Sequence, residues 1–191
     1  MKNIICIVGN PNCGKTTLFN ALTGSKQEVG NWPGVTVDKK TGRYSFEGND
    51  VEIVDLPGIY SITPASTSGE DERIARDYIL TDEAQAVINI VDASNLERNL
   101  YLTAQLIEMR VPMVVAVNML DIAKNHKIEV DLKALQQALG CPVVGLVAAR
   151  EQGVRELQKT VAEFLKNPQL PPMNVSFEDR IEKAREAITQ G

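Results

Sequence analysis

The pattern that most constrains this chain stands near its start, where a short apolar run meets a glycine-rich loop. Residues 4–8 are all apolar, and residues 9–16 read GNPNCGKT, a match to G-x-x-x-x-G-K-[ST]. In such a sequence the run is a buried strand, and the backbone N–H groups of the loop wrap phosphate groups. The helix that follows adds the positive end of its dipole. The pattern therefore predicts a phosphate-binding α/β fold.

Specific residues of this loop carry the expected chemistry. Lys15 is expected to reach the β- and γ-phosphates of a nucleotide, and the Thr16 hydroxyl is expected to bind Mg²⁺. A simple surface turn is the alternative, but the strand before the loop and the helical sequence after it favour phosphate binding. The predicted nucleotide contacts in this region are Gly9, Asn10, Pro11, Asn12, Cys13, Gly14, Lys15, Thr16 and Thr17.

Further along the chain, short β-branched runs alternate with helical stretches, which predicts a parallel sheet with helices on both faces. Six strands are expected, at residues 4–8, 42–46, 51–54, 87–91, 112–117 and 143–147. Turn-forming residues 47–50 join two of them as a hairpin, so one strand runs antiparallel. Helices are expected at 14–22, 96–109 and 154–165, and a loop at 27–36. The predicted class is a P-loop NTPase with a Ras-like G domain.

The length of the chain fits one domain and an appendage. Its 191 residues, 43% hydrophobic, can bury a full core. We expect a G domain at 1–165, a proline-containing linker at 166–175, and the truncated start of a helical domain at 176–191. The last segment has an apolar helical face at Phe177, Ile181, Ala184 and Ile188. One helix cannot bury its own apolar face, so it either packs back on the domain or begins a module that continues elsewhere.

Composition excludes several other classes. The net charge of -5 argues against broad binding to nucleic-acid phosphates, so no nucleic acid is expected as a partner. The longest apolar run, residues 111–117, is far shorter than the roughly 18–20 residues of a membrane helix. Cys6, Cys13 and Cys141 are an odd number without close spacing, which indicates reduced thiols rather than a disulfide framework or a zinc site.

Two further segments are expected to sense the γ-phosphate. Asp55 and Gly58 end an apolar run as D-x-x-G, where the carboxylate is placed to hold Mg²⁺ and the Gly58 amide to contact the phosphate. In the preceding loop, Gly34, Val35 and Thr36 are expected to contact the nucleotide, and the Thr36 hydroxyl to complete the Mg²⁺ shell when GTP is bound. Its release after hydrolysis would make an order–disorder switch. Trp32 in this loop could instead be a packing anchor.

The base is expected to contact Asn118, Met119 and Asp121 of the N-x-x-D motif that follows an apolar run, and Asp121 is expected to select guanine. The Asp121 carboxylate can accept the guanine N1–H and the exocyclic amine, neither of which adenine presents, while Asn118 would brace the base and the phosphate loop. Met119 replaces the usual lysine of GTPases. The last base loop is expected at Val147, Ala148 and Ala149, where the usual serine is missing and nucleotide retention is therefore expected to be weaker.

Longer segments carry a family resemblance. GNPNCGKTTLFN at 9–20, VGNWPGVT at 29–36, DLPG at 55–58, VDASNLERNLYL at 91–102 and NMLD at 118–121 together resemble the N-terminal G domain of the ferrous iron transport protein B family. The second and fourth are far more specific than general GTPase motifs. The resemblance implies that a helical domain and a polytopic Fe²⁺-carrying membrane region of the same protein follow. It places the chain, itself soluble, at the cytoplasmic face of the bacterial inner membrane, and leaves open an oligomer formed through the membrane part.

The resemblance also implies a K⁺ site formed by the side chain of Asn12 and the backbone carbonyls of Gly30 and Trp32. Such an ion would neutralise charge near the bridging phosphate oxygens, as an arginine finger does elsewhere. The residue that orients water in Ras-like enzymes is missing, because Ile59-Tyr60 follows D-x-x-G. The backbone of the loop around Thr36, called switch I, and the side chains of Glu70 and Asp71 remain alternatives for that role. We therefore expect slow, potassium-stimulated GTP hydrolysis, with Lys15, Asn12 and Thr36 as the catalytic residues.

Three other functions stay open at this stage. A ribosome- or RNA-associated assembly GTPase shares the phosphate and base motifs, although the acidic and basic residues of the tail are mixed rather than predominantly basic. A nucleotide-binding regulator with negligible turnover is compatible with the missing glutamine. An ATP-using kinase is disfavoured by Asp121. Arg98 and Arg150 could approach phosphate or base, but a surface role is favoured for both.

Overall fold

The computed structural model describes residues 3–63, 68–81, 83–173 and 175–190. Its main sheet has seven strands in the order β2-β3-β4-β1-β5-β6-β8. Only β3 runs against the others, since it pairs antiparallel with both β2 and β4. The strands are β1 (Asn3–Gly9), β2 (Gln27–Asn31), β3 (Asp38–Phe46), β4 (Asn49–Asp55), β5 (Ala86–Asp92), β6 (Met113–Asn118) and β8 (Val143–Gly145). The predicted α/β class with one antiparallel strand is confirmed.

One strand contradicts the sequence prediction. The predicted loop at 27–36 is wrong for residues 27–31, which form the edge strand β2, paired with the first part of β3. The sheet therefore has one strand more than the six expected. Residues 28–31 are exposed, so this edge carries no apolar alternation that a sequence pattern could reveal. The backbone pairing of Val29 with Lys40 and Gly30 with Lys39 defines it instead.

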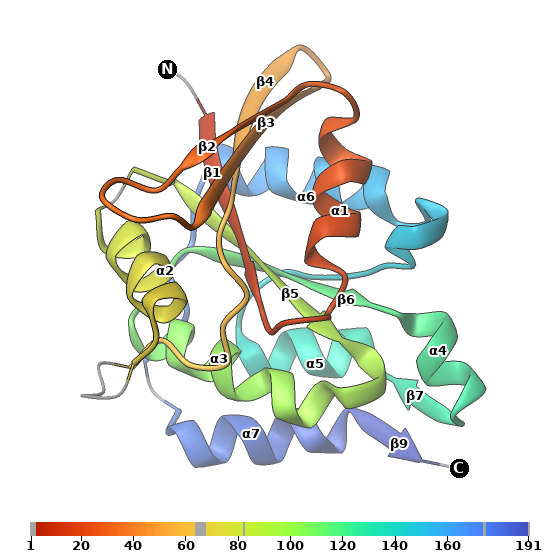
Figure 1. Cartoon of the computed structure of the whole chain (residues 1–191). Helices are drawn as coiled ribbons and strands as arrows, with labels where there is room; N and C mark the ends of the chain where they lie inside the picture. Colours follow the sequence, from red (N-terminus) through yellow and green to blue (C-terminus); the bar gives the residue numbers. More distant parts are fainter. Residues whose placement is uncertain (1–2, 64–67, 82, 174, 191) are drawn as a thin grey trace.

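Helices cover both faces of the sheet, as predicted (Figure 1). α1 (Lys15–Thr23) and α6 (Val154–Lys166) pack with the core that contains Ile5 and Ile7. The opposite face, which contains Cys6 and Val8, is covered by α2 (Glu70–Leu80), α3 (Leu96–Glu108) and α5 (Leu132–Leu139). The alternation of β1 side chains between two buried faces explains why residues 4–8 are continuously apolar. Short elements complete the fold: η1 (Ala93–Asn95), α4 (Leu120–Asn125) and η2 (Ala148–Arg150).

The C-terminal segment packs back on the domain. α7 (Phe177–Glu186) lies against α3 and α5, with Ile181 and Ala184 buried (Figure 1). Its end is tied down by a small sheet in which β9 (Ile188–Gln190) pairs with β7 (Ile128–Val130). The helix is shorter than the apolar helical face that ends at Ile188 indicates, because residues 188–190 form β9. The division at residues 165 and 175 stays a prediction, and Asn174 and Gly191 lie outside the described residues.

A buried cation fixes this tail. Arg180 is 2% exposed, and its guanidinium donates to the carbonyl oxygen of Leu139 at 3.1 Å and to that of Pro172. On the surface, Arg185 of α7 pairs with Glu97 of α3 at 2.5 Å. Within the described ranges, no helix has the length and apolar content needed to span a bilayer.

Candidate nucleotide site

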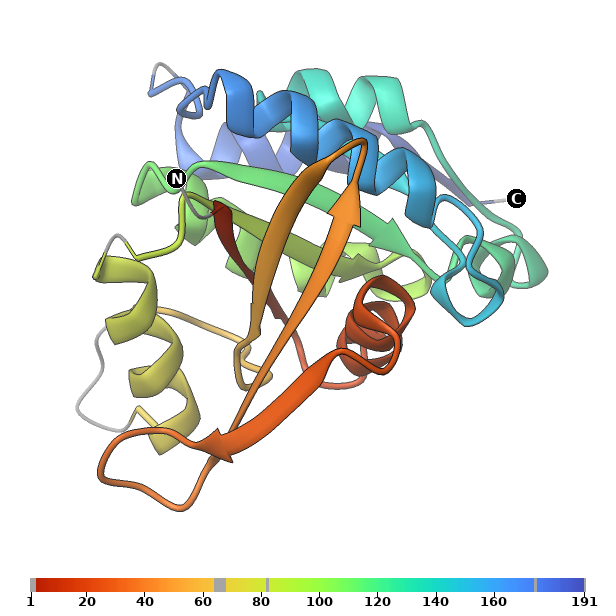
Figure 2. The ribbon, with the colours of Figure 1, turned by 90° about the horizontal axis from the view of Figure 1, so that it is seen from above.

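The predicted site lies where the parallel strands end. Ile7 of β1 pairs with Asp55 of β4, and Asp92 of β5 pairs with Asn118 of β6, so the loops that follow these strands emerge at one edge of the sheet. Ligands of open α/β sheets bind at this edge. Figure 2 shows the connection from β1 to α1 on the same side as the ends of β5 and β6. The topology therefore brings the phosphate loop, the D-x-x-G motif at residues 55–58 and the N-x-x-D motif at residues 118–121 to the same edge of the sheet.

The phosphate loop has the backbone that its sequence implies. Gly14 has a φ of 89° and precedes α1 directly, so a left-handed residue is needed there. A Cβ at Gly14 would overlap the side-chain amide nitrogen of Asn118, which is a second reason for glycine. At Gly9 a Cβ would lie 2.6 Å from the carbonyl oxygen of Ile90. Asn12 is exposed at the tip of the loop, with a φ of 65°.

Lys15 and Asp55 are brought together. The Lys15 ammonium lies 2.5 Å from the Asp55 carboxylate, and the two side chains are only 12% and 7% exposed. Thr16, the first-turn neighbour of Lys15, is exposed. Gly58 also approaches the phosphate loop, because a Cβ there would lie 3.2 Å from the Cα of Pro11. Here Lys15 and Asp55 pair with each other. A bound triphosphate would be a stronger partner for Lys15, and a divalent cation would be a stronger partner for Asp55.

Asn118 joins the two halves of the site. Its side-chain nitrogen donates to the carbonyl oxygen of Cys13 at 3.1 Å, and its side-chain oxygen accepts the amide of Ala148 at 2.9 Å. The residue is 3% exposed, so both hydrogen bonds are protected from water. One side chain thus fixes the distance between the phosphate loop and the last base loop. Met119 follows with a φ of 62° and lies close to Gly14.

The carboxylate that is predicted to select the base has a partner in the structure. Asp121, in the first turn of α4, lies 3.6 Å from the guanidinium of Arg150. Arg150 ends η2, and its side chain is 66% exposed, whereas that of Asp121 is 30% exposed. The sequence does not predict this pair, because it favours a surface role for Arg150. Only the three-dimensional structure shows that α4 and η2 lie close enough for the two side chains to meet.

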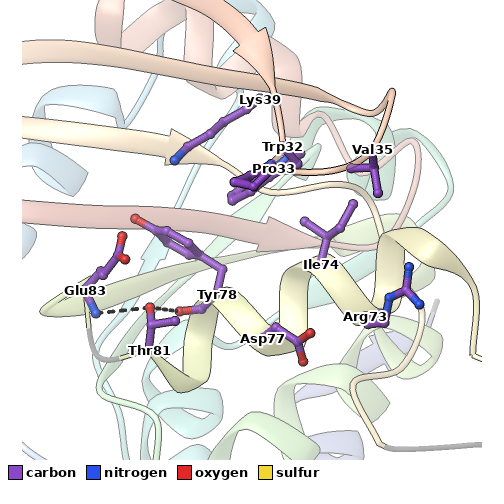
Figure 3. Close-up of a pocket in the computed structure, with 10 residues that line it drawn as sticks. All are labelled: Trp32, Pro33, Val35, Lys39, Arg73, Ile74, Asp77, Tyr78, Thr81 and Glu83. Atoms are coloured by element: carbon purple, nitrogen blue, oxygen red, sulfur yellow. Dashed lines mark hydrogen bonds between the residues drawn. The ribbon is translucent and has the colours of Figure 1, made fainter.

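Switch I lies away from the phosphate loop, which connects β1 to α1 (Figure 1), and beside α2 (Figure 3). Trp32 is 6% exposed, and its ring meets Tyr78 of α2 edge to face at 5.4 Å. The ammonium of Lys39 sits 4.8 Å from the centre of the Trp32 ring. Trp32 is therefore a packing anchor in this conformation, which was one of the two predicted roles. A cavity of about 310 Å³ lies between this loop and α2.

The predicted switch I ligands are consequently not gathered at the site. Thr36 and Gly34 are exposed, Val35 packs toward α2, and the Trp32 carbonyl accepts the amide of Val35 at 3.2 Å. Gly30 belongs to the exposed edge strand β2. For these residues to join Thr16 and Asp55 the loop has to leave α2. Their roles remain predictions about the GTP-bound state.

Switch II, the segment that follows Gly58, begins with one buried residue and one exposed residue. Ile59 is 1% exposed and its amide donates to the Gly9 carbonyl oxygen at 3.0 Å, whereas Tyr60 is 45% exposed with its ring 4.6 Å from the Arg98 guanidinium. The Ile59 side chain points into the core and has no group that could orient water. Glu70 and Asp71 are exposed at the start of α2, with Glu70 3.8 Å from Arg73. None of these contacts selects a water-orienting residue.

Cys13 occupies the phosphate loop as a buried thiol. Burial raises its pKa to about 11, and the nearby Lys15 ammonium opposes that shift only in part. The thiol is 1% exposed and packs toward Gly9. Cys13 is therefore protonated at neutral pH and contributes backbone rather than reactive sulfur to the loop.

The donor set of the site suits a metal ion that stays largely hydrated. Among the described residues, no group of three or more histidine, cysteine, aspartate or glutamate side chains could hold a metal ion. One carboxylate, Asp55, and one hydroxyl, Thr16, fit an ion that keeps several waters and binds phosphate oxygens, as Mg²⁺ does.

The family model described as ferrous iron transport protein B matches residues 3–161. The chain belongs to this family. The Fe(2+) transporter FeoB of Escherichia coli K12 is 53% identical over 167 residues, which cover 87% of this chain and 22% of that protein. The chain therefore spans about a fifth of the length of the curated FeoB relatives that it matches.

Solved FeoB structures have the same fold. The cytosolic domain of L. pneumophila FeoB superposes with a TM-score of 0.84 at 45% identity, covering 91% of this chain and 73% of that one. A point mutant of S. thermophilus NFeoB bound to GDP gives a TM-score of 0.79 at 46% identity, covering 84% of this chain and 61% of that one. These comparisons confirm the family and the P-loop NTPase fold expected from the motifs.

Proposed function

We propose that this chain binds guanine nucleotides and hydrolyses GTP to GDP and phosphate, as the regulatory G domain of a ferrous iron transporter. The observation that carries the proposal is the pair of hydrogen bonds from Asn118 to Cys13 and Ala148. They hold a phosphate loop and a base loop at a fixed separation, and Asp121 follows on the adjoining helix turn. The GDP bound by the S. thermophilus relative supports the choice of nucleotide.

The proposed phosphate contacts come from the loop at residues 9–17. Lys15 would exchange its ion pair with Asp55 for the β- and γ-phosphates, and Asp55 would then be free to hold Mg²⁺ together with Thr16. When bound, Mg²⁺ would supply positive charge next to the transferred phosphoryl group. Thr36 would join from switch I. The base would be surrounded by Asn118, Met119, Asp121, Val147, Ala148 and Ala149.

Catalysis would rest on positioning and charge, because phosphoryl transfer leaves little covalent chemistry for the protein. Lys15 would neutralise charge on the phosphates while a water molecule attacks in line. K⁺ is proposed to bind the Asn12 side chain and the backbone carbonyls of Gly30 and Trp32. Its positive charge would stabilise the charge that develops on the phosphates in the transition state, as an arginine finger does in other enzymes. The exposed Asn12 side chain is accessible for this role. The Trp32 carbonyl, which now accepts from Val35, would first have to turn away from that amide.

The output of the domain is proposed to be control of Fe²⁺ passage. The E. coli and Salmonella relatives are Fe(2+) transporters, and this chain matches 22% and 21% of their length. Residues 1–165 would be the G domain, 166–175 a linker, and 176–191 the start of a helical domain of the same protein. Its place would be the cytoplasmic face of the membrane. Switch I around Thr36 and switch II after Gly58 would report the nucleotide state to the rest of the transporter.

The test is single-turnover GTP hydrolysis with Mg²⁺, in KCl and in NaCl at equal ionic strength. We expect slow turnover in NaCl and an increase of at least about tenfold in KCl, in the direction of the larger arginine-finger effects. Asn12→Ala should remove the difference between the two salts. Asn125→Ala is the matched control, because Asn125 is an exposed residue at the end of α4, away from the phosphate loop.

Each other outcome rejects a stated part of the proposal. Equal turnover in both salts rejects K⁺ stimulation. Tight GTP binding without turnover in either salt makes the domain a binding-only regulator. Absence of GDP binding rejects the function itself, and salt-sensitive RNA binding would favour an assembly GTPase instead.

A further inference from the structure

Arg150 and Asp121 form a pair that the general chemistry of the site does not require. The ion pair spans 3.6 Å and joins the end of η2 to the first turn of α4. Asp121 is the carboxylate that the proposed function assigns to guanine selection. The role inferred for Arg150 therefore rests on that function.

The backbone on both sides of the pair is held firmly. The amide of Ala148, at the start of η2, is bonded to Asn118 at 2.9 Å, and the amide of Arg150 donates to the Val147 carbonyl oxygen at 3.0 Å. Val147 and Gln152 exchange backbone hydrogen bonds at 3.1 and 3.2 Å and close the loop. The long Arg150 side chain, which is 66% exposed, can move without disturbing these backbone hydrogen bonds.

A guanidinium group and a guanine base offer a carboxylate similar donors. The N1–H and exocyclic amine of guanine form a planar fork of two donors, and the arginine side chain presents a planar fork of the same kind with a full positive charge. A carboxylate accepts such forks with its two oxygens. In the structure one guanidinium nitrogen of Arg150 lies 3.6 Å from one carboxylate oxygen of Asp121. A base that takes both oxygens of Asp121 has to displace that contact.

We propose that Arg150 is an internal competitor for guanine: its guanidinium pairs with Asp121 in the nucleotide-free site and has to leave before the base can bind. Arg150 thereby lowers the affinity of the site for guanine nucleotides and its preference for guanine over adenine. A base that makes no contact with Asp121 does not have to displace it. Because the ion pair is partly exposed, its contribution to the free energy is small, and we expect it to change the affinity for GDP by about two- to fivefold.

The test is stopped-flow binding of a fluorescent GDP analogue to the wild-type chain and to Arg150→Ala. Competition acts on the free protein, so the variant should bind about two- to fivefold faster with an unchanged dissociation rate. The gain should shrink in about 1 M salt, which screens the ion pair. Arg150→Lys keeps the charge but not the planar fork, and should fall between the two.

Lys124→Ala is the matched control. Lys124 is an exposed cation on α4, and its removal changes the net charge by the same amount. Loss of a positive charge alone should slow the association of an anionic nucleotide slightly, which is opposite to the effect expected for Arg150→Ala.

Three results would overturn the inference while leaving the proposed function intact. Slower association of Arg150→Ala would mean that Arg150 orients Asp121 for the base. Faster dissociation would mean that it holds the bound nucleotide. Unchanged rates, with normal GDP binding by the wild type, would mean that the pair has no part in recognition. Failure of the wild type to bind GDP would instead reject the proposed function.

Discussion

At the scale of single residues, the site depends on a few side chains that each satisfy two requirements. Asn118 bonds the phosphate loop and the base loop together, and Gly14 leaves room for its amide. Asp55 balances Lys15 at 2.5 Å. The bridging role of Asn118 could be predicted from sequence because it belongs to a local motif whose chemistry requires that residue type. The pairing of Arg150 with Asp121 could not, since it depends on how two distant loops meet.

The cysteines provide a prediction at this scale. Burial raises the pKa of Cys13 to about 11 and those of Cys6 and Cys141 to about 12. A raised pKa favours the protonated thiol, so at about pH 8 only about one Cys13 in a thousand is a thiolate. We expect a chromogenic disulfide reagent to titrate almost no thiol in the folded chain at that pH. The same reagent should titrate all three after unfolding in guanidinium chloride. Rapid labelling of the folded chain would contradict this environment for the thiols.

At the scale of elements, the buried parts of the fold could be predicted from sequence and some exposed parts could not. Apolar runs mark β1, β5 and β6, which lie inside the sheet. The edge strand β2 carries no such signal because most of its side chains face solvent. The sequence also leaves open whether the last helix packs back or begins a module. The apolar face of α7 is buried on α3 and α5 here, a contact between distant segments that periodicity cannot identify.

Switch I offers a prediction at the element scale. Trp32 is the one tryptophan of the chain, and it is buried against Tyr78 of α2. If Thr36 joins Mg²⁺ in the GTP state, the loop has to leave α2 and expose the indole. We expect a red shift of tryptophan emission when a non-hydrolysable GTP analogue binds with Mg²⁺, and a smaller shift with GDP.

Tyr78→Ala is the companion variant for this measurement. Without its aromatic partner, Trp32 should emit at longer wavelength before any nucleotide is added, and the further shift should be reduced. An emission maximum that stays constant at saturating analogue would show that switch I remains on α2 in the GTP state.

At the scale of the whole molecule, a seven-stranded sheet presents the predicted nucleotide loops along one edge, and the C-terminal helix lies on the layer formed by α3 and α5 (Figure 1). Arg185 and Glu97 join α7 to the start of α3, and the next residue, Arg98, meets Tyr60 of switch II. Switch II and the C-terminal tail are therefore in contact with the same helix.

The central claim is that this edge of the sheet is a guanine-nucleotide site. The most direct test is competition: a fluorescent GDP analogue is bound to the intact chain with Mg²⁺ and displaced with GDP or with ADP. The account predicts that GDP displaces the probe at concentrations at least about a hundredfold lower than ADP, because only guanine offers Asp121 two donors. Asp121→Asn should abolish most of that difference. Displacement by ADP and GDP at comparable concentrations would contradict the account.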